Sequence, residues 1–465
     1  MNILIVGNGF DLSHYLPTKY DHFMVAMDAI EKWDIANGEM SFDDLFGSLY
    51  EKEDYFFGYT KAMYKTDEIK ISVEQVIKLK KKLEENVWYQ YFADHVREVK
   101  TWIDFEDKIS QALKILMKFI EKLSIYLDKS NASEINFYSL KSIFKAYQMD
   151  INEKEKDVIT IFKLFLEKVI EKDKESIFYE QGEGEYSKFW EFNESYLLKI
   201  EKAHLYFLEF RSDLFINFIY ESLNVFIEIF NFYLCKIVNS LELLDERLLK
   251  TYSENFPDII YSFNYTNTFF KRYGNRQVDF LHGKIGADQN IVLGVSEIER
   301  EILEKYKIYG FLKYHQKLLK DTDYLFLNNY IKETHRNNEE ISELKPRLGQ
   351  GYDEMTKQSF RAVIQKLKKL NIQIFIWGHS LDVSDKSYIA EIFSFNYDYD
   401  QQVRVIIFYF NQTAKFDLLA NLIHILGNEL IEKWMKNGWL KFKPNPDIAE
   451  LNNIKPVELP KIAEA

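Results

Sequence analysis

The pattern of apolar and polar positions changes once along the chain. Neither glycine nor proline occurs between Gly58 and Gly182, and proline is absent between Pro17 and Pro257. Long stretches rich in Lys, Glu, Leu, Ile and Phe without these residues are typical of helix interiors. The pattern predicts helices over residues 71–86, 88–127, 139–147, 153–172 and 187–244.

From Pro257 onward, short apolar runs alternate with turns and with helical patterns. Strands are predicted over 258–263, 277–281, 291–293, 373–377 and 403–410, and helices over 298–307, 353–370, 385–393 and 416–435. Nearly continuous apolar strands are typical of a parallel sheet covered on both faces. Because strands and helices alternate, we expect a doubly wound α/β sheet.

The N-terminus supplies one more strand of this kind. An apolar run stops at Gly7-Asn8-Gly9-Phe10-Asp11, and a helical pattern follows Leu16-Pro17-Thr18. Glycine permits a sharp turn after a strand and lets a phosphate approach backbone N–H groups at a helix N-terminus. The dinucleotide-binding fingerprint requires a third glycine at the position that Leu12 occupies in this chain. The turn is therefore an incomplete nucleotide-binding signal.

These patterns suggest an architecture in which both ends of the chain build one domain. Residues 1–60 and 250–440 would form a discontinuous α/β nucleotide-binding domain, interrupted by an all-helical insertion over residues 61–249. Four of the seven prolines fall in the last 25 residues, so we expect residues 441–465 to form an extended tail; these prolines are Pro444, Pro446, Pro456 and Pro460.

Charge and composition narrow the class of protein. A formal net charge of −13 argues against a general nucleic-acid-binding surface, because neutralising phosphates takes clustered Lys and Arg. The single cysteine, Cys235, excludes an intrachain disulfide and suits a reducing cytosol. Residues 214–238 are apolar but carry Glu221 and Glu228, so we interpret them as a core helix rather than a membrane span. We expect a cytoplasmic protein.

Candidate chemistry gathers directly after the predicted strands. In an open α/β sheet, ligands bind outside the carboxyl ends of the strands. His282 follows one strand and could act as a general base, because imidazole titrates near neutral pH. Asn264 follows another, and its amide could hold a sugar hydroxyl or a water. No metal-ligand spacing stands out, and no metal is expected.

Several short motifs resemble the AbiH family of bacterial phage abortive-infection proteins, in the family's order and across almost the whole chain. They are Gly7-Asn8-Gly9-Phe10-Asp11-Leu12, Leu16-Pro17-Thr18-Lys19-Tyr20, Trp102-Ile103-Asp104-Phe105-Glu106, Ser262-Phe263-Asn264-Tyr265-Thr266, Leu281-His282-Gly283 and Gly378-His379-Ser380-Leu381-Asp382. The resemblance implies a cytoplasmic, toxin-like effector of anti-phage defence, with a phage-derived trigger. It also implies a homo-oligomer, because related immune effectors need gating.

A more distant resemblance concerns mechanism. The glycine turn and the segments at Asn264, His282 and Gly378 are similar to four segments of sirtuins, which implies a sirtuin-like, Rossmann-like fold and NAD as substrate or ligand. By this resemblance Asn264 contacts the nicotinamide ribose and His282 is catalytic, with Asp11 assisting electrostatically. The candidate nucleotide contacts are Gly7, Asn8, Gly9, Phe10, Thr18, Gly283, Gly378, His379, Ser380 and Asp382.

Departures from the sirtuin pattern modify this expectation. Thr266 stands where sirtuins have Asp, and Asn8 replaces Ala. The four zinc-binding cysteines of sirtuin deacylases cannot exist in a chain with one cysteine. The pattern therefore favours hydrolysis of NAD+ at the nicotinamide–ribose bond over protein deacylation.

Two alternatives from other classes stay open. A nuclease acting on RNA or DNA could draw acid–base or metal groups from its histidines and aspartates; these are His14, His22, His282, His379, Asp11, Asp382 and Asp385. A non-catalytic nucleotide sensor could hold a ligand in the same crevice without turnover. Within the predicted insertion, Asp104 and Glu106 either face solvent or reach the crevice as a lid carboxylate.

Overall fold

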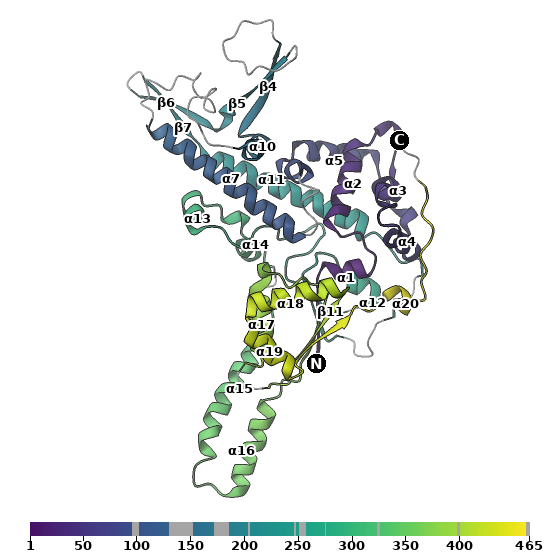
Figure 1. Ribbon diagram of the computed structural model, residues 1–465, viewed down its shortest axis with the longest axis vertical. Helices are drawn as coiled ribbons and strands as arrows, with labels where there is room; N and C mark the ends of the chain where they lie inside the picture. Colours follow the sequence, from purple (N-terminus) through teal and green to yellow (C-terminus); the bar gives the residue numbers. More distant parts are fainter. Residues whose placement is uncertain are drawn as a thin grey trace.

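The computed structural model describes residues 1–94, 102–129, 152–171, 186–202, 205–245, 248–250, 257–274, 276–322, 326–397 and 400–461. Figure 1 shows an elongated molecule with a helical body above a parallel sheet and a long helical hairpin at the lower end. The predicted helix over 139–147 lies outside the described residues.

One six-stranded parallel sheet organises the fold. Its strands stand in the order β12-β11-β10-β1-β8-β9, and every neighbouring pair is parallel. Chain order therefore runs outward in both directions from β1, and the reversal falls between β1 and β10, where a doubly wound fold places its ligand crevice. This confirms the predicted α/β fold. The strands are β1 Asn2–Val6, β8 Ile259–Ser262, β9 Val278–Phe280, β10 Gln373–Trp377, β11 Arg404–Tyr409 and β12 Leu440–Pro444.

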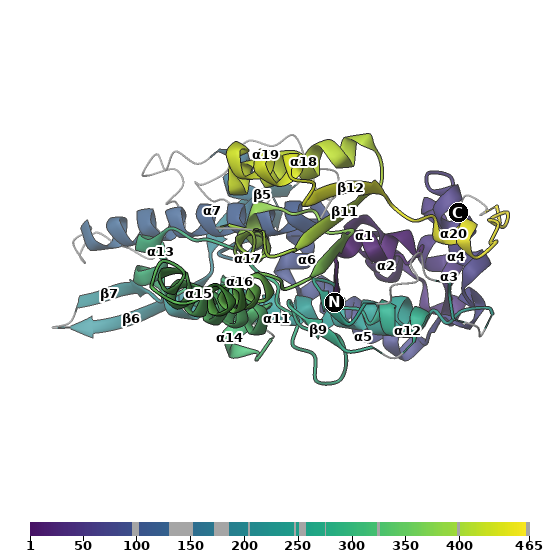
Figure 2. The same ribbon diagram turned by 90° about the horizontal axis from the view of Figure 1, so that it is seen from below.

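Both faces of this sheet are covered, which explains its apolar strands. Side chains alternate between the faces of a strand, so Ile3 and Ile5 join one buried cluster while Leu4 and Val6 join the other. The first cluster includes residues of α17 Lys386–Ser394, α18 Gln412–Leu426 and α19 Asn428–Lys436. Figure 2 shows α18 and α19 lying over β11 and β12.

The opposite face continues into the helical body. It contains α2 Tyr20–Lys32, α3 Phe42–Phe46, α4 Asp54–Met63, α5 Val73–Glu85, α6 Val87–Asp94, α7 Trp102–Lys129 and α11 Ser212–Tyr233. The Trp88 indole donates to the Ile219 carbonyl at 2.7 Å and ties α6 to α11. Helices from residues 1–60 and from the predicted insertion thus share one core.

One described helical segment, Ser212–Val238, is long and apolar enough to cross a membrane by length and composition alone. Half of its most apolar window is buried inside the protein. Phe226 and Phe230 of this segment pack against Phe23 of α2. Its inner face is therefore part of the protein core.

The prediction that the insertion is entirely helical is wrong. After α10 Glu153–Ile161 come two antiparallel hairpins, formed by β4 Phe165–Glu171 with β5 Tyr186–Phe192, and by β6 Leu197–Lys202 with β7 Leu205–Phe210. A lack of glycine and proline does not distinguish a helix from a strand, because the interiors of both avoid these residues. Aromatic residues, which are enriched in strands, are frequent in this stretch, as in Tyr186–Phe192.

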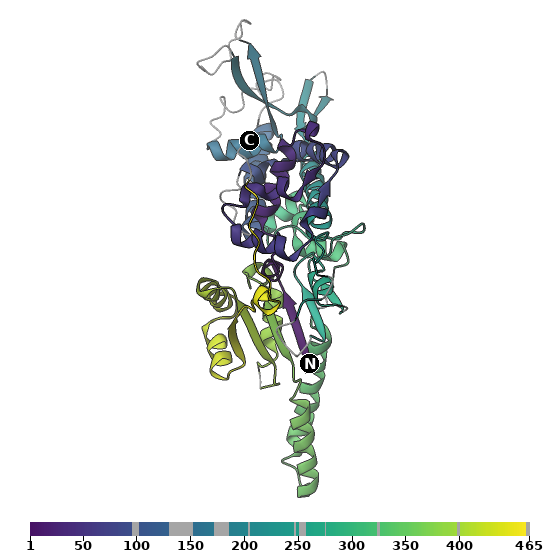
Figure 3. The same ribbon diagram turned by 90° about the vertical axis from the view of Figure 1, so that its right-hand side faces the viewer.

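Further differences concern the ends of elements. Residues 291–293 are not a strand, and the tail contributes β12 and α20 Ile448–Leu451 before an extended segment. The predicted helix 416–435 divides into α18 and α19 at Gly427, whose φ is 84°. The predicted helix 298–307 is confirmed as α13 Arg300–Tyr306. Three other helices were not predicted: α12 Thr268–Tyr273, α14 Lys313–Leu319 and α15 Asn328–Arg347. With α16 Glu354–Leu367, α15 forms the hairpin that extends from the molecule in Figure 3.

Candidate active site

The carboxyl ends of four neighbouring strands bring the candidate residues to one edge of the sheet. Val6 at the end of β1 pairs with Ser262 on one side and Trp377 on the other, so the segments that follow all three strands start at one level. The Leu281 amide donates to the Ser262 carbonyl at 2.8 Å and brings the end of β9 to the same level. Parallel pairing thus gathers residues from distant parts of the chain.

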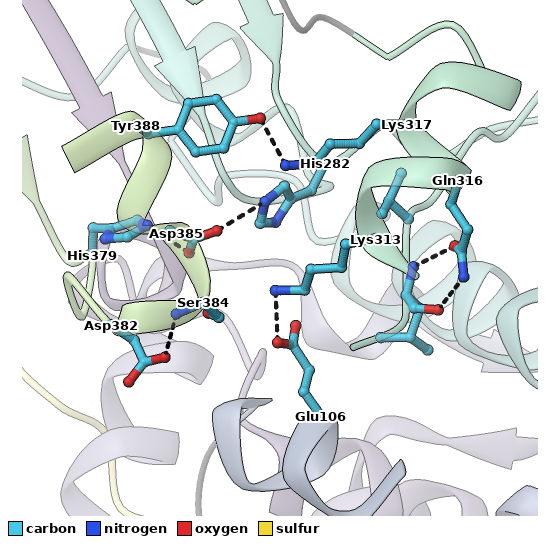
Figure 4. Close-up of polar contacts among 12 residues, drawn as sticks. Glu106, His282, Lys313, Gln316, Lys317, His379, Asp382, Ser384, Asp385 and Tyr388 are labelled. Atoms are coloured by element: carbon cyan, nitrogen blue, oxygen red, sulfur yellow. Dashed lines mark hydrogen bonds and ion pairs between the residues drawn. The ribbon is translucent and has the colours of Figure 1, made fainter. Parts of the chain in front are cut away.

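At this edge two histidines share one carboxylate. Asp385, which precedes α17, places Oδ1 3.3 Å from His282 Nε2 and Oδ2 3.3 Å from His379 Nε2 (Figure 4). All three residues are buried. The Phe263 ring packs edge-on against both imidazoles, with centroid distances of 5.1 Å to His282 and 4.0 Å to His379. We call His282, Asp385 and His379 the histidine–aspartate cluster.

Hydrogen bonding fixes the tautomer of one histidine. The Leu381 amide donates to His379 Nδ1 at 2.9 Å, so Nδ1 acts as an acceptor and the neutral ring carries its proton on Nε2. That proton faces Asp385. In contrast, His282 Nε2 and Asp385 Oδ1 make no well-aligned hydrogen bond with any described residue. Buried polar atoms without such partners are rare, and they mark places where a substrate or water can bind.

Burial sets the protonation of this cluster. Desolvation lowers the pKa of His282 to about 4, outweighing the opposite effect of Asp385. Burial also acts to raise the pKa of Asp385, but the adjacent His282, Lys313 and His379 hold that pKa well below its usual value. At neutral pH the cluster therefore holds a neutral His282 beside an ionised carboxylate, which is the state that a general base requires.

Two lysines and a glutamate cover the cluster. Lys313 and Lys317 stand one turn apart on α14, and Lys313 Nζ lies 2.6 Å from Glu106 Oε2 of α7. Lys317 donates to the Tyr388 hydroxyl at 2.7 Å (Figure 4). Burial raises the pKa of Glu106 to about 7 against the pull of Lys313, and lowers the pKa of Lys317 to about 8.

The glycine turn, Gly7-Asn8-Gly9, is packed against the turn after β10. The Gly9 amide donates to the Gly378 carbonyl at 2.8 Å, and the Gly7 amide to the Trp377 carbonyl at 3.0 Å. A Cβ on Gly7 would lie 2.6 Å from His379 Cα, and one on Gly9 would lie 2.7 Å from Gly378 Cα. Both glycines are required for close backbone packing, and the amides of both already donate hydrogen bonds to backbone carbonyls.

Asn264 and Asp11 belong to the glycine turn rather than to the histidine–aspartate cluster. The Asn264 amide donates to the Gly7 carbonyl at 2.9 Å, and the Thr266 hydroxyl donates to Asp11 Oδ2. Asp11 is almost fully buried, and desolvation raises its pKa to about 6 against the effect of these polar neighbours. His379 connects the two groups, because it contacts Gly7 and shares Asp385 with His282.

The other predicted contacts lie around these groups in different settings. Phe10 is a core residue whose ring meets Trp377 edge-on at 5.0 Å. Gly283 has a φ of 84°, and a Cβ there would lie 2.0 Å from the Asn290 carbonyl oxygen. Asp382 accepts a hydrogen bond from the Ser384 amide at 2.9 Å and caps a short helical turn. Asn8 is the first residue of α1 Asn8–Ser13, Thr18 is buried after its end, and Ser380 is exposed beside the cluster.

The histidines named for a nuclease are not brought together. His14 contacts the Phe10 carbonyl and Tyr273, whereas His22 contacts Glu53. Among the described residues, no group of three or more His, Cys, Asp or Glu side chains is arranged to hold a metal ion. Only His282 and His379 of the four lie at the sheet edge.

Sequence reasoning missed three members of the site. Lys313, Lys317 and Tyr388 lie on helices that carry no recognisable motif, and the spacing of four residues between the lysines is common on solvated helix faces. Glu106 does reach the site, as one of the two alternatives for the insertion carboxylates expected. The side chain of Asp104 lies outside those described.

The parallel sheet and the buried acid–base groups at its carboxyl edge define a class: an α/β protein with a polar centre beside the point where strand order reverses. Comparison with protein families then identifies the chain. The family model described as Bacteriophage abortive infection AbiH matches residues 3–220 and 185–409, and the chain belongs to this family of anti-phage abortive-infection proteins. Searches of curated proteins and of solved structures found no match.

Proposed function

We propose that this abortive-infection protein is an enzyme that hydrolyses NAD+ at the nicotinamide–ribose bond. The observation that supports the proposal most is the unpartnered Nε2 of neutral His282, buried beside Asp385 next to the reversal of strand order. Dinucleotides bind at such reversals in doubly wound sheets.

The proposed reaction breaks the bond between the nicotinamide nitrogen and the ribose carbon, and the bonding electrons leave with nicotinamide. Water attacks the oxocarbenium-like carbon and gives ADP-ribose, and His282 accepts the proton that the water loses. Asp385, whose Oδ1 lies 3.3 Å from the same Nε2, would stabilise the resulting imidazolium through its opposite charge. Asn264, at the glycine turn, would contact the nicotinamide ribose.

Purified protein is incubated with NAD+, with and without lysate of phage-infected cells, and nicotinamide and ADP-ribose are quantified by chromatography. Wild type should release both in equal amounts, and His282→Ala should release them about 10²-fold more slowly or less. His424→Ala changes an exposed histidine on α18 and is the matched control. Release by His282→Ala at a rate close to that of wild type would rule out the assigned base.

A metabolite profile of cells that express wild type or His282→Ala separates the proposal from its alternatives. Depletion of NAD+ by wild type alone is the expected result. Degraded RNA or DNA with intact NAD+ would instead assign the centre to a nuclease. A growth arrest that leaves both pools intact would contradict hydrolysis and favour a nucleotide sensor.

A further inference from the structure

One ammonium group at the candidate site, that of Lys317, makes no ion pair with a carboxylate of the described residues, although Asp385 and Glu106 act on it through space. The carboxylate of Glu106 pairs with Lys313, and Asp385 contacts both histidines. Lys317 Nζ is buried, yet its contacts among the described residues are the hydroxyl and the ring of Tyr388, with the ring centroid at 4.4 Å. A phenol and its π face stabilise an ammonium but supply no net negative charge.

The helix that carries Lys317 is fixed in place. Gln316, between the two lysines, donates to the Leu293 carbonyl at 2.7 Å and to the Gly310 carbonyl at 2.8 Å, and its own carbonyl oxygen accepts from the Leu293 amide at 3.0 Å. The Lys313 amide donates to the Val295 carbonyl at 2.9 Å. These bonds hold α14 so that both ammonium groups enter the site (Figure 4). A rigid helix that presents two buried cations is suited to hold an anion.

The glycine turn is a poorer place for that anion. Its Gly7 and Gly9 amides already donate to the carbonyls of Trp377 and Gly378. An amide that is bonded to protein would have to lose that bond before it could bind a phosphate oxygen. A phosphate could bind Lys317 without breaking an ion pair. At Lys313 it would have to replace only the Glu106 carboxylate.

We infer that Lys313 and Lys317 of α14 form a phosphate-binding subsite, in which the Glu106 carboxylate is the internal partner that a phosphate of the substrate replaces. The chemical class of ligand is a nucleoside diphosphate or a pyrophosphate, whose adjacent charges match two cations one helical turn apart. Burial lowers the pKa of Lys317 to about 8, and the Asp385 and Glu106 carboxylates offset this only in part. The inference builds on the proposed function only in taking the phosphate to be that of NAD+.

The test measures binding rather than turnover. Inorganic pyrophosphate and ADP-ribose are titrated into the full-length protein by isothermal calorimetry, with uncharged adenosine as the comparison. Lys317→Met should weaken binding of both anions roughly tenfold to a hundredfold, the range for a charge-assisted hydrogen bond. Glu106→Gln, which frees Lys313 from its carboxylate, should tighten binding about threefold or more.

Two further variants separate recognition from structural effects. Lys320→Met removes a lysine that bonds the Ile291 carbonyl and Gln316 instead of entering the site, and it should bind as wild type does. Lys317→Arg keeps the charge and should retain measurable affinity, which covers the case in which Lys317→Met does not fold. A lysine that only supports the fold would lower the melting temperature when replaced and leave anion affinity unchanged.

The results of these measurements test the phosphate subsite separately from the proposed reaction. Wild type that binds neither anion at millimolar concentration, or Lys317→Met that binds both as wild type does, would overturn the subsite. Lys317-dependent binding of pyrophosphate without cleavage of NAD+ would support the subsite and contradict the hydrolase. Cleavage of NAD+ by wild type, together with unchanged anion affinity in Lys317→Met, would support the hydrolase and contradict the subsite.

Discussion

His282 Nε2 lies 3.3 Å from Asp385 Oδ1, and each atom is buried without another hydrogen-bond partner among the described residues. The two residues come from the turn after β9 and from the start of α17. Desolvation keeps the imidazole neutral, since it lowers the pKa of His282 to about 4. A neutral ring beside an ionised carboxylate can accept a proton, and the charge that then forms is stabilised.

Replacing this base should remove most of the activity. His282→Ala is expected to lower kcat for nicotinamide release by about 10²-fold or more, the usual contribution of a positioned general base. Steady-state kinetics with NAD+ check this, and calorimetry with ADP-ribose should show that the variant still binds the product. A kcat within threefold of wild type would mean that another group accepts the proton.

The shared carboxylate should also matter for stability. Asp385→Asn leaves two buried imidazoles and Lys313 without the charge that faces them, and breaking such a buried network costs about 3–5 kcal/mol. Urea unfolding at pH 7 measures the loss. Asp400→Asn breaks an exposed pair with Arg404 and should cost about 1 kcal/mol or less. Equal losses in the two variants would contradict the structural role given to Asp385.

The sequence located the strand ends because their apolar runs and following turns are local features. Strands β1, β10 and β11 were predicted nearly to the residue, and His282 and His379 were placed at the correct edge. The carboxylate that links His282 and His379 could not be located from local sequence. Asp385 was recognised only as one acidic residue among several, because its position between two imidazoles depends on the pairing of β9 and β10 with strands between them.

The missed features share one physical cause. A buried lysine looks like a solvated one in sequence, and α14 gives no sign that Lys313 and Lys317 face inward. The strands of the two hairpins lie largely within the predicted helices 153–172 and 187–244, because helix and strand both avoid glycine and proline in their interiors. In both cases tertiary contacts, rather than local preference, decide the outcome.

The glycine turn gives a prediction about packing. Gly9→Ala would place a Cβ 2.7 Å from Gly378 Cα and 3.0 Å from its carbonyl oxygen, both backbone atoms that cannot move aside cheaply. We expect a loss of about 1–3 kcal/mol in the free energy of unfolding, as for overpacking. Gly351→Ala, at a position with open space, is the control and should change stability little. Denaturant titration of both variants distinguishes a packing glycine from one reserved for a ligand.

Glu106 should make stability depend on pH. Its pKa rises from 4.5 to about 7 on folding because burial disfavours the charged form, with Lys313 opposing and Asp385 and Asp382 reinforcing the rise. The folded protein therefore keeps a proton that the unfolded chain has lost between these pH values. The stabilisation is complete below pH 4.5 and disappears as pH rises through 7. The shift corresponds to about 3 kcal/mol.

The measurement is the difference in free energy of unfolding between wild type and Glu106→Gln, followed from pH 4.5 to pH 8. Asp11, whose pKa is raised to about 6, acts in the same direction, and His282, whose pKa is lowered to about 4, acts in the opposite one. Both contributions cancel in the difference, which should fall by about 2–3 kcal/mol across the range. A difference for Glu106→Gln that does not vary with pH would show that Glu106 is ionised throughout, and that its pairing with Lys313 outweighs its burial.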